Sequence, residues 1–262
     1  MLHLLRGALI CAFIFPFTGP EARLARVGRW SASLLRILGI GLDAAGTPRG
    51  GATLVVANHV SWLDILAINA VHPCRFVSKA DVRHWPLIGW LVACGGTLFI
   101  ERERKRDALR VVHQVADALR QGQTLAVFPE GTTSDGHGLL PFHANLLQAA
   151  VSTGAPVQPV ALRFSDATEP VSQAAAYVGD THLLRSVWMI VTARGMRVRV
   201  DWLAPMPMTG DDRRVVSEVL RQRILAALRG DDVAGDEGAA DKAADKAAVA
   251  VTNSRDEQAG VR

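Results

Sequence analysis

The sequence predicts an α/β domain with a mostly parallel central sheet that is covered by helices. From residue 52 onward, short runs rich in β-branched and apolar residues alternate with longer helical segments, and this alternation is typical of parallel strands joined by crossover helices. The chain has 262 residues, of which 49% are apolar and 21% charged, which is enough to bury a substantial core. We expect the domain to span residues 46–230.

The individual elements follow from the local patterns. Residues 52–57 (ATLVVA) have the length and β-branching of a buried strand, and a helix ending near residue 70 follows it. Residues 107–121 place Asp107, Arg110, Gln114 and Asp117 in one polar stripe at helical spacing. By the same criteria we predict further strands at 75–78, 97–100, 124–128, 157–164 and 195–203. Further helices are predicted at 143–152, 183–191 and 215–228.

The two ends of the chain differ from this body. Residues 7–20 are apolar except for Thr18, are interrupted by Pro16, and precede Arg23, Arg26 and Arg29. Fourteen residues are too few to span a bilayer comfortably as a helix, so we expect residues 1–45 to lie in the membrane interface, with a buried helix pair as the alternative. Residues 231–262 carry almost no large apolar side chains, and we expect a disordered acidic tail there.

The charge distribution indicates an anionic partner. Residues 1–230 contain 25 basic and 17 acidic residues, whereas residues 231–262 contain four basic and eight acidic ones. An anionic membrane surface fits better than a nucleic acid, because no basic strip interleaved with aromatic residues is present. The sequence also lacks the nucleotide-binding G-x-x-x-x-G-K-[ST] and the zinc-binding H-E-x-x-H patterns, and we predict neither a metal nor a cofactor.

A histidine and an aspartate follow the first predicted strand. Asn58 and His59 come directly after it, and Asp64 lies five residues beyond His59. On a regular helix that spacing separates two side chains by about 140°, so they meet only if His59 lies in the turn and Asp64 one turn into the helix. Ser61 would then cap that helix. The carboxylate would orient the imidazole as a general base, although such a pair alone is more often structural.

Three further groups are placed at strand ends. Arg102 follows the strand at 97–100 and offers a donor fork that suits a phosphate or a carboxylate. Residues 128–134 (FPEGTTS) form a loop directly after another strand. The prolines at 156–160, Pro159 among them, open a strand and fit a role in shaping an acyl pocket or the sheet edge. Each group taken alone has an ordinary structural explanation.

Together, and in this order, the four groups resemble the 1-acylglycerol-3-phosphate acyltransferase family. The family pattern N-H-x4-D is matched by Asn58, His59 and Asp64, and its F-P-E-G-T-x-S by residues 128–134, which include Pro129 and Ser134. Its G-x-x-F-I-x-R is matched at 96–102, with Phe99 and Arg102, and its proline block at 156–160. Lys79 stands where members of the family often carry a lysine.

The resemblance implies direct acyl transfer to a membrane lipid acceptor. His59, oriented by Asp64, would take the proton from the hydroxyl of lysophosphatidate as that oxygen attacks an acyl thioester, without an acyl-enzyme, to give phosphatidate. The donor would be acyl-CoA or acyl carrier protein. The residues that would bind the acceptor are Arg102, Lys79, Glu130, Gly131 and Thr132. Because acyl donors are cytosolic, we expect the enzyme at the cytoplasmic face of the bacterial inner membrane.

Three alternatives stay open at this point. Phe142-His143-Ala144-Asn145 stands where many relatives carry F-K-x-G. Together with Tyr177-Val178-Gly179-Asp180 and the L-L-x-S-V-W run that follows, this departure resembles a bacterial subgroup that includes ornithine-lipid acyltransferases, in which Arg102 would meet a carboxylate. A serine lipid hydrolase would use Ser61 or Ser134, but no G-x-S-x-G is present. A membrane-binding protein without catalysis is the third alternative.

Overall fold

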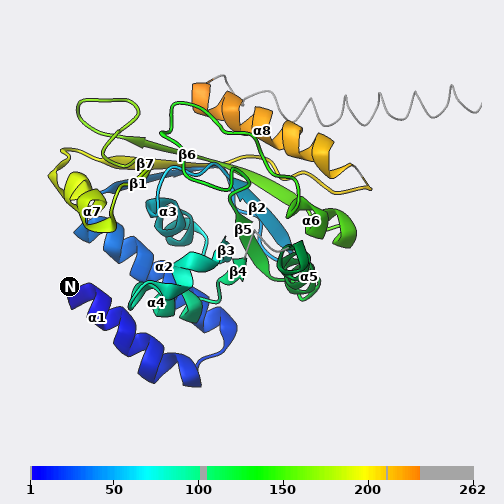
Figure 1. Ribbon diagram of the computed structural model, residues 1–262, viewed down its shortest axis with the longest axis horizontal. Coiled ribbons are helices and arrows are strands. Elements are labelled where there is room, and N and C mark those ends of the chain that lie inside the picture. The colour runs from blue at the N-terminus through cyan, green and yellow to red at the C-terminus, as the bar shows by residue number, and fades with distance from the viewer. Residues whose placement is uncertain (1, 101–104, 211, 231–262) are drawn as a thin grey trace, which may run out of the picture.

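The computed structural model describes residues 2–100, 105–210 and 212–230. Within these residues, the centre of the molecule is a seven-stranded sheet in the order β1-β7-β6-β2-β5-β3-β4 (Figure 1). The strands are β1 (Gly41–Ala45), β2 (Thr53–Ala57), β3 (Arg75–Lys79), β4 (Leu98–Ile100), β5 (Thr124–Val127), β6 (Val157–Ser165) and β7 (Arg197–Trp202). All neighbouring strands pair in parallel except β6 and β7. The α/β fold with a mostly parallel sheet is therefore confirmed.

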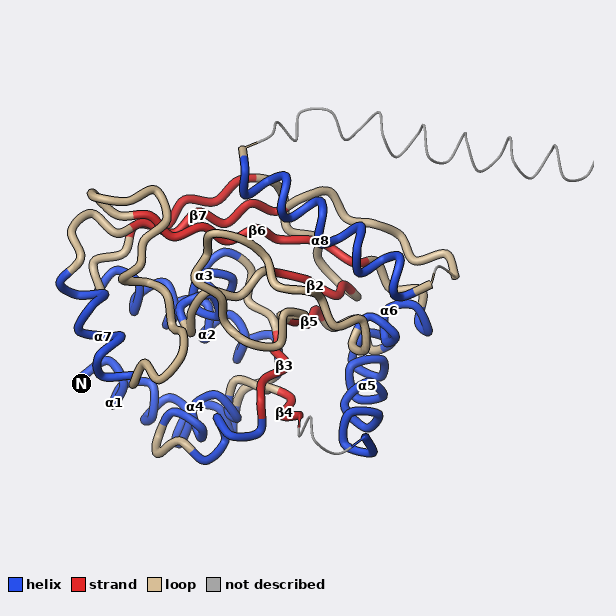
Figure 2. The backbone as a smooth tube through the Cα atoms, turned by 45° about the horizontal axis from the view of Figure 1, so that its top comes forward, coloured by secondary structure: helices blue, strands red, loops and turns tan. Residues whose placement is uncertain are grey.

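Helices cover both faces of this sheet (Figure 2). One core cluster joins it to α2 (Pro20–Ile37), α3 (Leu63–Val71) and α7 (Leu183–Thr192). A second joins its other face to α5 (Lys105–Arg120), α6 (Leu147–Thr153) and α8 (Arg213–Arg229). Because both faces are covered, all five residues of the central strand β2 are buried, as expected for a parallel sheet.

The first residues form a helical hairpin. It runs through α1 (Leu2–Leu9), a π-helical turn η1 (Ile10–Ile14) and a short 3-10 helix η2 (Phe15–Phe17) before α2. The arms meet where the ring of His3 stacks on that of Trp30 at 4.9 Å, and Gly7 lies where a Cβ would approach Trp30 Nε1 to 2.8 Å. Among the described residues, no helix is both long and apolar enough to cross a membrane.

The structure contains elements that the sequence analysis did not predict. Strand β1 lies within the segment 1–45 that we assigned to the N-terminus, yet it forms the edge of the sheet beside β7. Helix α4 (Ile88–Cys94) and the 3-10 helix η3 (Ala80–His84) lie between β3 and β4. Helix α6 begins at Leu147 rather than His143. The acidic tail that we predicted to be disordered lies outside the described residues.

Candidate active site

The candidate active site begins where β2 ends. Parallel strands place their carboxyl ends along one edge of a sheet, and ligands of open α/β sheets bind there. Residues 58–62 leave β2 at that edge and lead into α3, whose first turn contains Asp64. The neighbouring strand β5 ends at the same edge and leads into the loop that contains Glu130.

His59 and Asp64 form the centre of the site. His59 Nδ1 lies 2.7 Å from Asp64 Oδ2, and the same oxygen accepts hydrogen bonds from the backbone N–H groups of Val60 (2.7 Å) and Ser61 (2.9 Å). The Asp64 side chain is fully buried, whereas that of His59 is 20% exposed. The turn thus meets the condition that the spacing set for a contact, because His59 lies before α3 and Asp64 in its first turn. The second ring nitrogen of His59 is unbonded within the described residues.

The predicted cap by Ser61 is wrong. Trp62, not Ser61, is the residue that precedes α3, and its side chain makes no capping hydrogen bond. The Ser61 hydroxyl is buried without a hydrogen-bond partner in the described part of the chain, and only its backbone carbonyl accepts from Asp64 N, at 3.1 Å. The Asp64 side chain bonds the N–H groups of Val60 and Ser61, which precede the helix, and so fixes the turn rather than capping α3.

Phe128 supports the imidazole from one side. Its ring stacks on that of His59 with 4.1 Å between centroids and 11° between planes, and Phe76 stacks behind it at 5.9 Å. Sequence reasoning noted Phe128 within the F-P-E-G-T-x-S pattern but gave it no role. The stacking limits rotation of the ring and leaves its polar edge as the accessible part.

Glu130 holds two loops together. Its Oε1 accepts the backbone N–H of His59 at 2.7 Å, and its Oε2 accepts that of Leu140 at 2.9 Å. Burial is the largest influence on this carboxyl and raises its pKa, while the two backbone N–H groups act in the opposite direction. With both oxygens occupied, Glu130 positions the His59 turn from behind.

The rest of the loop at 128–134 secures the same turn. Gly131 turns the chain with φ = 78°, a conformation that favours glycine. Ser134 donates to the carbonyl of His59 through its N–H (2.8 Å) and its hydroxyl (3.2 Å). Thr132 is exposed. The hydroxyl of Thr133 donates to the carbonyl of Tyr177, whose own N–H donates to Val60 O at 3.0 Å.

Asn58 fixes the turn to the sheet. Its side chain is buried and bonds both backbone groups of Leu162 on β6: Nδ2 donates to the carbonyl at 2.9 Å, and Oδ1 accepts the N–H at 2.7 Å. On the same strand Pro159 faces Val56 of β2, and its carbonyl accepts from Leu203 N at 3.0 Å. Both residues thus have structural roles around the site.

The residues expected to bind the acceptor lie partly outside this cluster. Arg102 is outside the described residues. Phe99 lies on β4, where the Arg83 guanidinium is 5.9 Å from the ring centroid. Lys79 is at the carboxyl end of β3, with Nζ 2.5 Å from Asp81 Oδ2 and a largely exposed side chain. Because β3 and β4 pair in parallel, both end at the edge of the sheet where β2 and β5 end.

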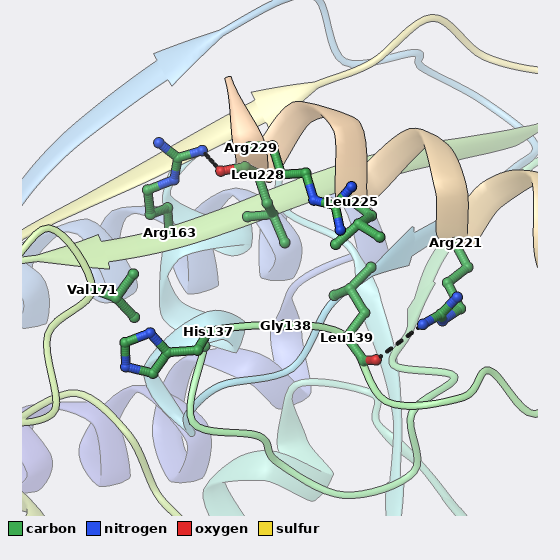
Figure 3. A pocket seen from close by; sticks show the side chains of 10 residues that line it. His137, Gly138, Leu139, Arg163, Val171, Arg221, Leu225, Leu228 and Arg229 are labelled. Carbon is green, nitrogen blue, oxygen red and sulfur yellow. Dashed lines mark hydrogen bonds between the residues drawn. The ribbon is translucent and has the colours of Figure 1, made fainter. Parts of the chain in front are cut away.

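A cavity of about 310 Å³ lies between α8 and the segment 136–139 (Figure 3). Three arginines line it, and two of them are bonded to backbone carbonyls. Arg163 donates to Ala227 O and Leu228 O at the end of α8, and Arg221 donates to Leu139 O and Leu140 O. These contacts hold α8 against the sheet and against the loop that Glu130 bonds. His59 does not line this cavity.

Both the sequence and the fold of this chain match known acyltransferases. A sequence model of the family described as Acyltransferase matches residues 43–163. A 1-acyl-sn-glycerol-3-phosphate acyltransferase of Neisseria meningitidis serogroup B (strain MC58) is 38% identical over 81% of this chain and 84% of that protein. A lyso-ornithine lipid O-acyltransferase of Pseudomonas aeruginosa PAO1 is also 38% identical, over 77% of each chain.

The fold itself matches a solved enzyme. The crystal structure of the 1-acyl-sn-glycerophosphate acyltransferase PlsC from Thermotoga maritima aligns with a TM-score of 0.58 at 22% identity, over 85% of this chain and 92% of that one. The protein belongs to the acyltransferase family that includes the lysophosphatidate and lyso-ornithine lipid acyltransferases. The resemblance stated from its motifs is therefore confirmed.

Proposed function

We propose that this protein transfers a fatty acyl group from an acyl thioester to the free hydroxyl of lysophosphatidate, giving phosphatidate. The observation that carries the proposal is the 2.7 Å contact between His59 Nδ1 and the buried Asp64 carboxylate. The name of the Neisseria relative, a 1-acyl-sn-glycerol-3-phosphate acyltransferase, supports this choice of acceptor.

The geometry supports general-base catalysis by His59. A carboxylate that accepts from Nδ1–H leaves the lone pair of Nε2 available to take a proton. Nε2 takes the proton of the acceptor hydroxyl as its oxygen bonds to the thioester carbonyl carbon. The carbon–sulfur bond then breaks, and the thiolate leaves with the proton that the imidazolium returns. The thioester is already activated, so an enzyme nucleophile is not required.

Neither candidate nucleophile of a hydrolase fits this arrangement. The Ser61 hydroxyl is buried and has no bond to His59, and the Ser134 hydroxyl donates to the backbone carbonyl of His59 rather than to its ring. A serine hydrolase needs its nucleophile within hydrogen-bond reach of the base. Direct transfer to the acceptor is therefore the better explanation of the site.

The acceptor and the donor are assigned by charge. In our proposal Arg102 binds the phosphate of the acceptor with help from Lys79. Gly131 and Thr132 contact the glycerol of the acceptor. Glu130 contributes by holding the His59 turn in place. The donor is acyl-CoA or acyl carrier protein, and the basic body of the chain suits an acidic carrier. No metal or further cofactor takes part in this proposal.

Lyso-ornithine lipid is the second candidate acceptor. The Pseudomonas relative that carries this name is as similar to the chain as the Neisseria protein is. Ornithine lipid has no phosphate, so Arg102 would then bind its carboxylate. His59 and Asp64 would do the same chemistry on either acceptor.

The N-terminal hairpin supports a location at the membrane. Leu2, Leu5 and Leu9 of α1 are all about half exposed or more, and Phe13 and Phe17 continue this apolar stripe with 68% and 88% of their surface exposed. Arg6 and Arg29 are exposed nearby. We propose that this face lies in the interface of an anionic bilayer, at the cytoplasmic side of the bacterial inner membrane.

The proposal is tested by acyl transfer with the wild type, His59→Ala and the control His113→Ala, whose histidine is exposed on α5. Lysophosphatidate and lyso-ornithine lipid are each offered with acyl-CoA and with acyl carrier protein. We expect transfer to lysophosphatidate, a loss of about 10²–10⁴-fold in His59→Ala, and no loss in His113→Ala.

Other outcomes assign other functions. Transfer confined to lyso-ornithine lipid would keep the mechanism and change the acceptor. Release of free fatty acid that Ser61→Ala or Ser134→Ala abolishes would identify a hydrolase. Vesicle binding without turnover on any acceptor would identify a non-catalytic membrane protein.

A further inference from the structure

Helix α7 presents its most apolar side to the outside of the molecule. Leu184, Trp188 and Val191 recur at i, i+4 and i+7 and so share one face, where 84%, 68% and 48% of their surface is exposed. The opposite face is buried and contains Ser186 and Ile190. A helix that packs on a globular core normally has the reverse arrangement, so the outer face of α7 fits a partner other than water.

The charges around α7 indicate what that partner is. The helix contains no acidic residue, Arg185 is exposed within it, and Arg194 is exposed two residues beyond its end. Neither arginine side chain makes an ion pair in the part of the chain that the structure describes. Tryptophan and leucine on one face with arginines at its border are typical of a helix that lies in an anionic membrane interface. A second copy of the same helix would instead bring like charges together.

The position of α7 agrees with a membrane contact. Both views of the backbone place α7 at the same end of the molecule as the first residues of α1 (Figures 1 and 2). The beginning of α1 and helix α7, which both carry exposed apolar side chains, therefore lie at the same end of the molecule. The inference takes the apolar faces of the hairpin and of α7 to contact the same bilayer.

The inner side of α7 contacts the candidate active site. Ser186 Oγ accepts a hydrogen bond from Trp62 Nε1 at 3.1 Å, and Trp62 directly follows the residues whose N–H groups bond Asp64. The segment that leads into α7 is also tied to this turn, through Tyr177 N and Val60 O at 3.0 Å. These two bonds therefore link α7 to the segment that carries His59.

We propose that α7 is a second membrane-contact element, in which Leu184, Trp188 and Val191 enter the acyl region of an anionic bilayer while Arg185 and Arg194 meet its headgroups. It places the His59 turn at the surface where a lipid acceptor lies. The inference extends the proposed function, but binding to a bilayer is measured separately from acyl transfer.

The test uses the full-length protein and vesicles of equal parts phosphatidylglycerol and phosphatidylcholine. The variant Leu184→Asp/Trp188→Asp is compared with Val215→Asp/Val219→Asp, which changes two exposed valines on α8, across the sheet. We expect the lipid concentration at which half of the protein sediments with vesicles to rise at least about tenfold in the α7 variant. In the α8 variant this concentration should match that of the wild type.

A conservative variant locates Trp188 directly. Lipids brominated in the acyl chain should quench the tryptophan fluorescence of the wild type more than that of Trp188→Phe, which keeps the apolar face intact. Acyl transfer to a short-chain, water-soluble acceptor should be equal in the α7 variant and the wild type, whereas transfer to the acceptor presented in vesicles should fall.

Several results would overturn the inference. Equal vesicle binding by the α7 variant and the wild type, or equal quenching with and without Trp188, would show that α7 does not enter the bilayer. Conversion of a wild-type dimer into a monomer by the α7 substitutions would assign the face to a second copy. Vesicle binding without acyl transfer in the wild type would contradict the proposed function alone.

Discussion

His59 is fixed by two contacts to its ring and two to its backbone. Asp64 bonds Nδ1, Phe128 stacks on the ring, Glu130 accepts the backbone N–H, and Ser134 donates to the backbone carbonyl. In the proposed reaction His59 takes a proton from a bound acceptor, and such constraint favours this step because small displacements of reacting groups are costly in rate. In the proposed reaction, Phe128, Glu130 and Ser134 therefore act by holding His59 in position.

At this residue scale, Glu130→Gln is expected to damage both stability and activity. One of the two backbone N–H groups that Glu130 bonds would face an amide NH₂, and a buried unsatisfied donor costs about 1–3 kcal/mol. Displacement of the His59 turn should lower acyl transfer by up to about 10²-fold. Urea unfolding and the transfer assay measure the two effects, and an unchanged kcat would show that Glu130 does not position His59.

The effect of Glu130→Gln on the free energy of unfolding is expected to depend on pH. Burial raises the pKa of Glu130, so the folded state holds this proton more tightly than the unfolded chain. That contribution to stability is fully present below the ordinary glutamate pKa and is lost as pH rises through the raised value. The free energy of unfolding of the wild type minus that of Glu130→Gln should therefore fall as pH rises from about 4, and a difference that rises would contradict the shift.

At the scale of elements, close packing of α2 on α3 attaches the N-terminal hairpin to the domain. A Cβ added at Gly28 would lie 2.5 Å from Pro73 Cγ and 2.9 Å from the carbonyl oxygen of Asn69. The Asn69 side chain accepts from Cys74 N at 3.1 Å and holds the end of α3. The contact between the two helices therefore depends on the absence of a side chain at position 28.

We expect Gly28→Ala to lower stability by about 1–3 kcal/mol, because a proline ring and a backbone carbonyl must shift to admit the methyl group. Alanine gains at most about 1 kcal/mol in helix propensity, so the clash decides the sign. Thermal unfolding measures the effect. Gly50→Ala, where nothing lies within 4 Å of the added Cβ, is the control, and a stabilised Gly28→Ala would refute the close contact.

At the scale of the whole molecule, the hairpin and α7 carry many of the exposed large apolar side chains of the described residues, while the sheet is covered on both faces. The chain carries a net charge of +4, and its basic residues are concentrated before the acidic tail. Apolar contact and charge thus act in the same direction at an anionic surface. In the proposed function, this arrangement would bring the edge of the sheet that contains His59 to the lipid acceptor.

Phe13→Asp/Phe17→Asp should weaken vesicle binding of the whole protein by about tenfold or more, because two largely exposed rings would no longer leave water. The far-ultraviolet circular dichroism should not change, since neither ring belongs to the core. Leu109→Asp on α5, 60% exposed, serves as the control. Binding that is equal in all three proteins would place the membrane contact elsewhere.

The sequence by itself determined the elements with strong local patterns. The β-branched run at 53–57 and the polar stripe of α5 are readable because strand and helix periodicity depends on neighbouring residues. The contact between His59 and Asp64 could also be considered from the sequence, since the two residues lie only five positions apart. Strand β1 (GLDAA) was not, because it has no β-branched residue and forms a strand by pairing with β7, more than 150 positions away.

Only the tertiary structure decided what surrounds His59. Glu130 bonds it across 71 positions, and Phe128 reaches its ring because β2 and β5 are neighbours in the sheet. Likewise, the link between Trp62 and Ser186 spans 124 positions. The motifs contained many of these residues but not their partners. Strand order is set by how the helices cover the sheet, and no local pattern along the chain records it.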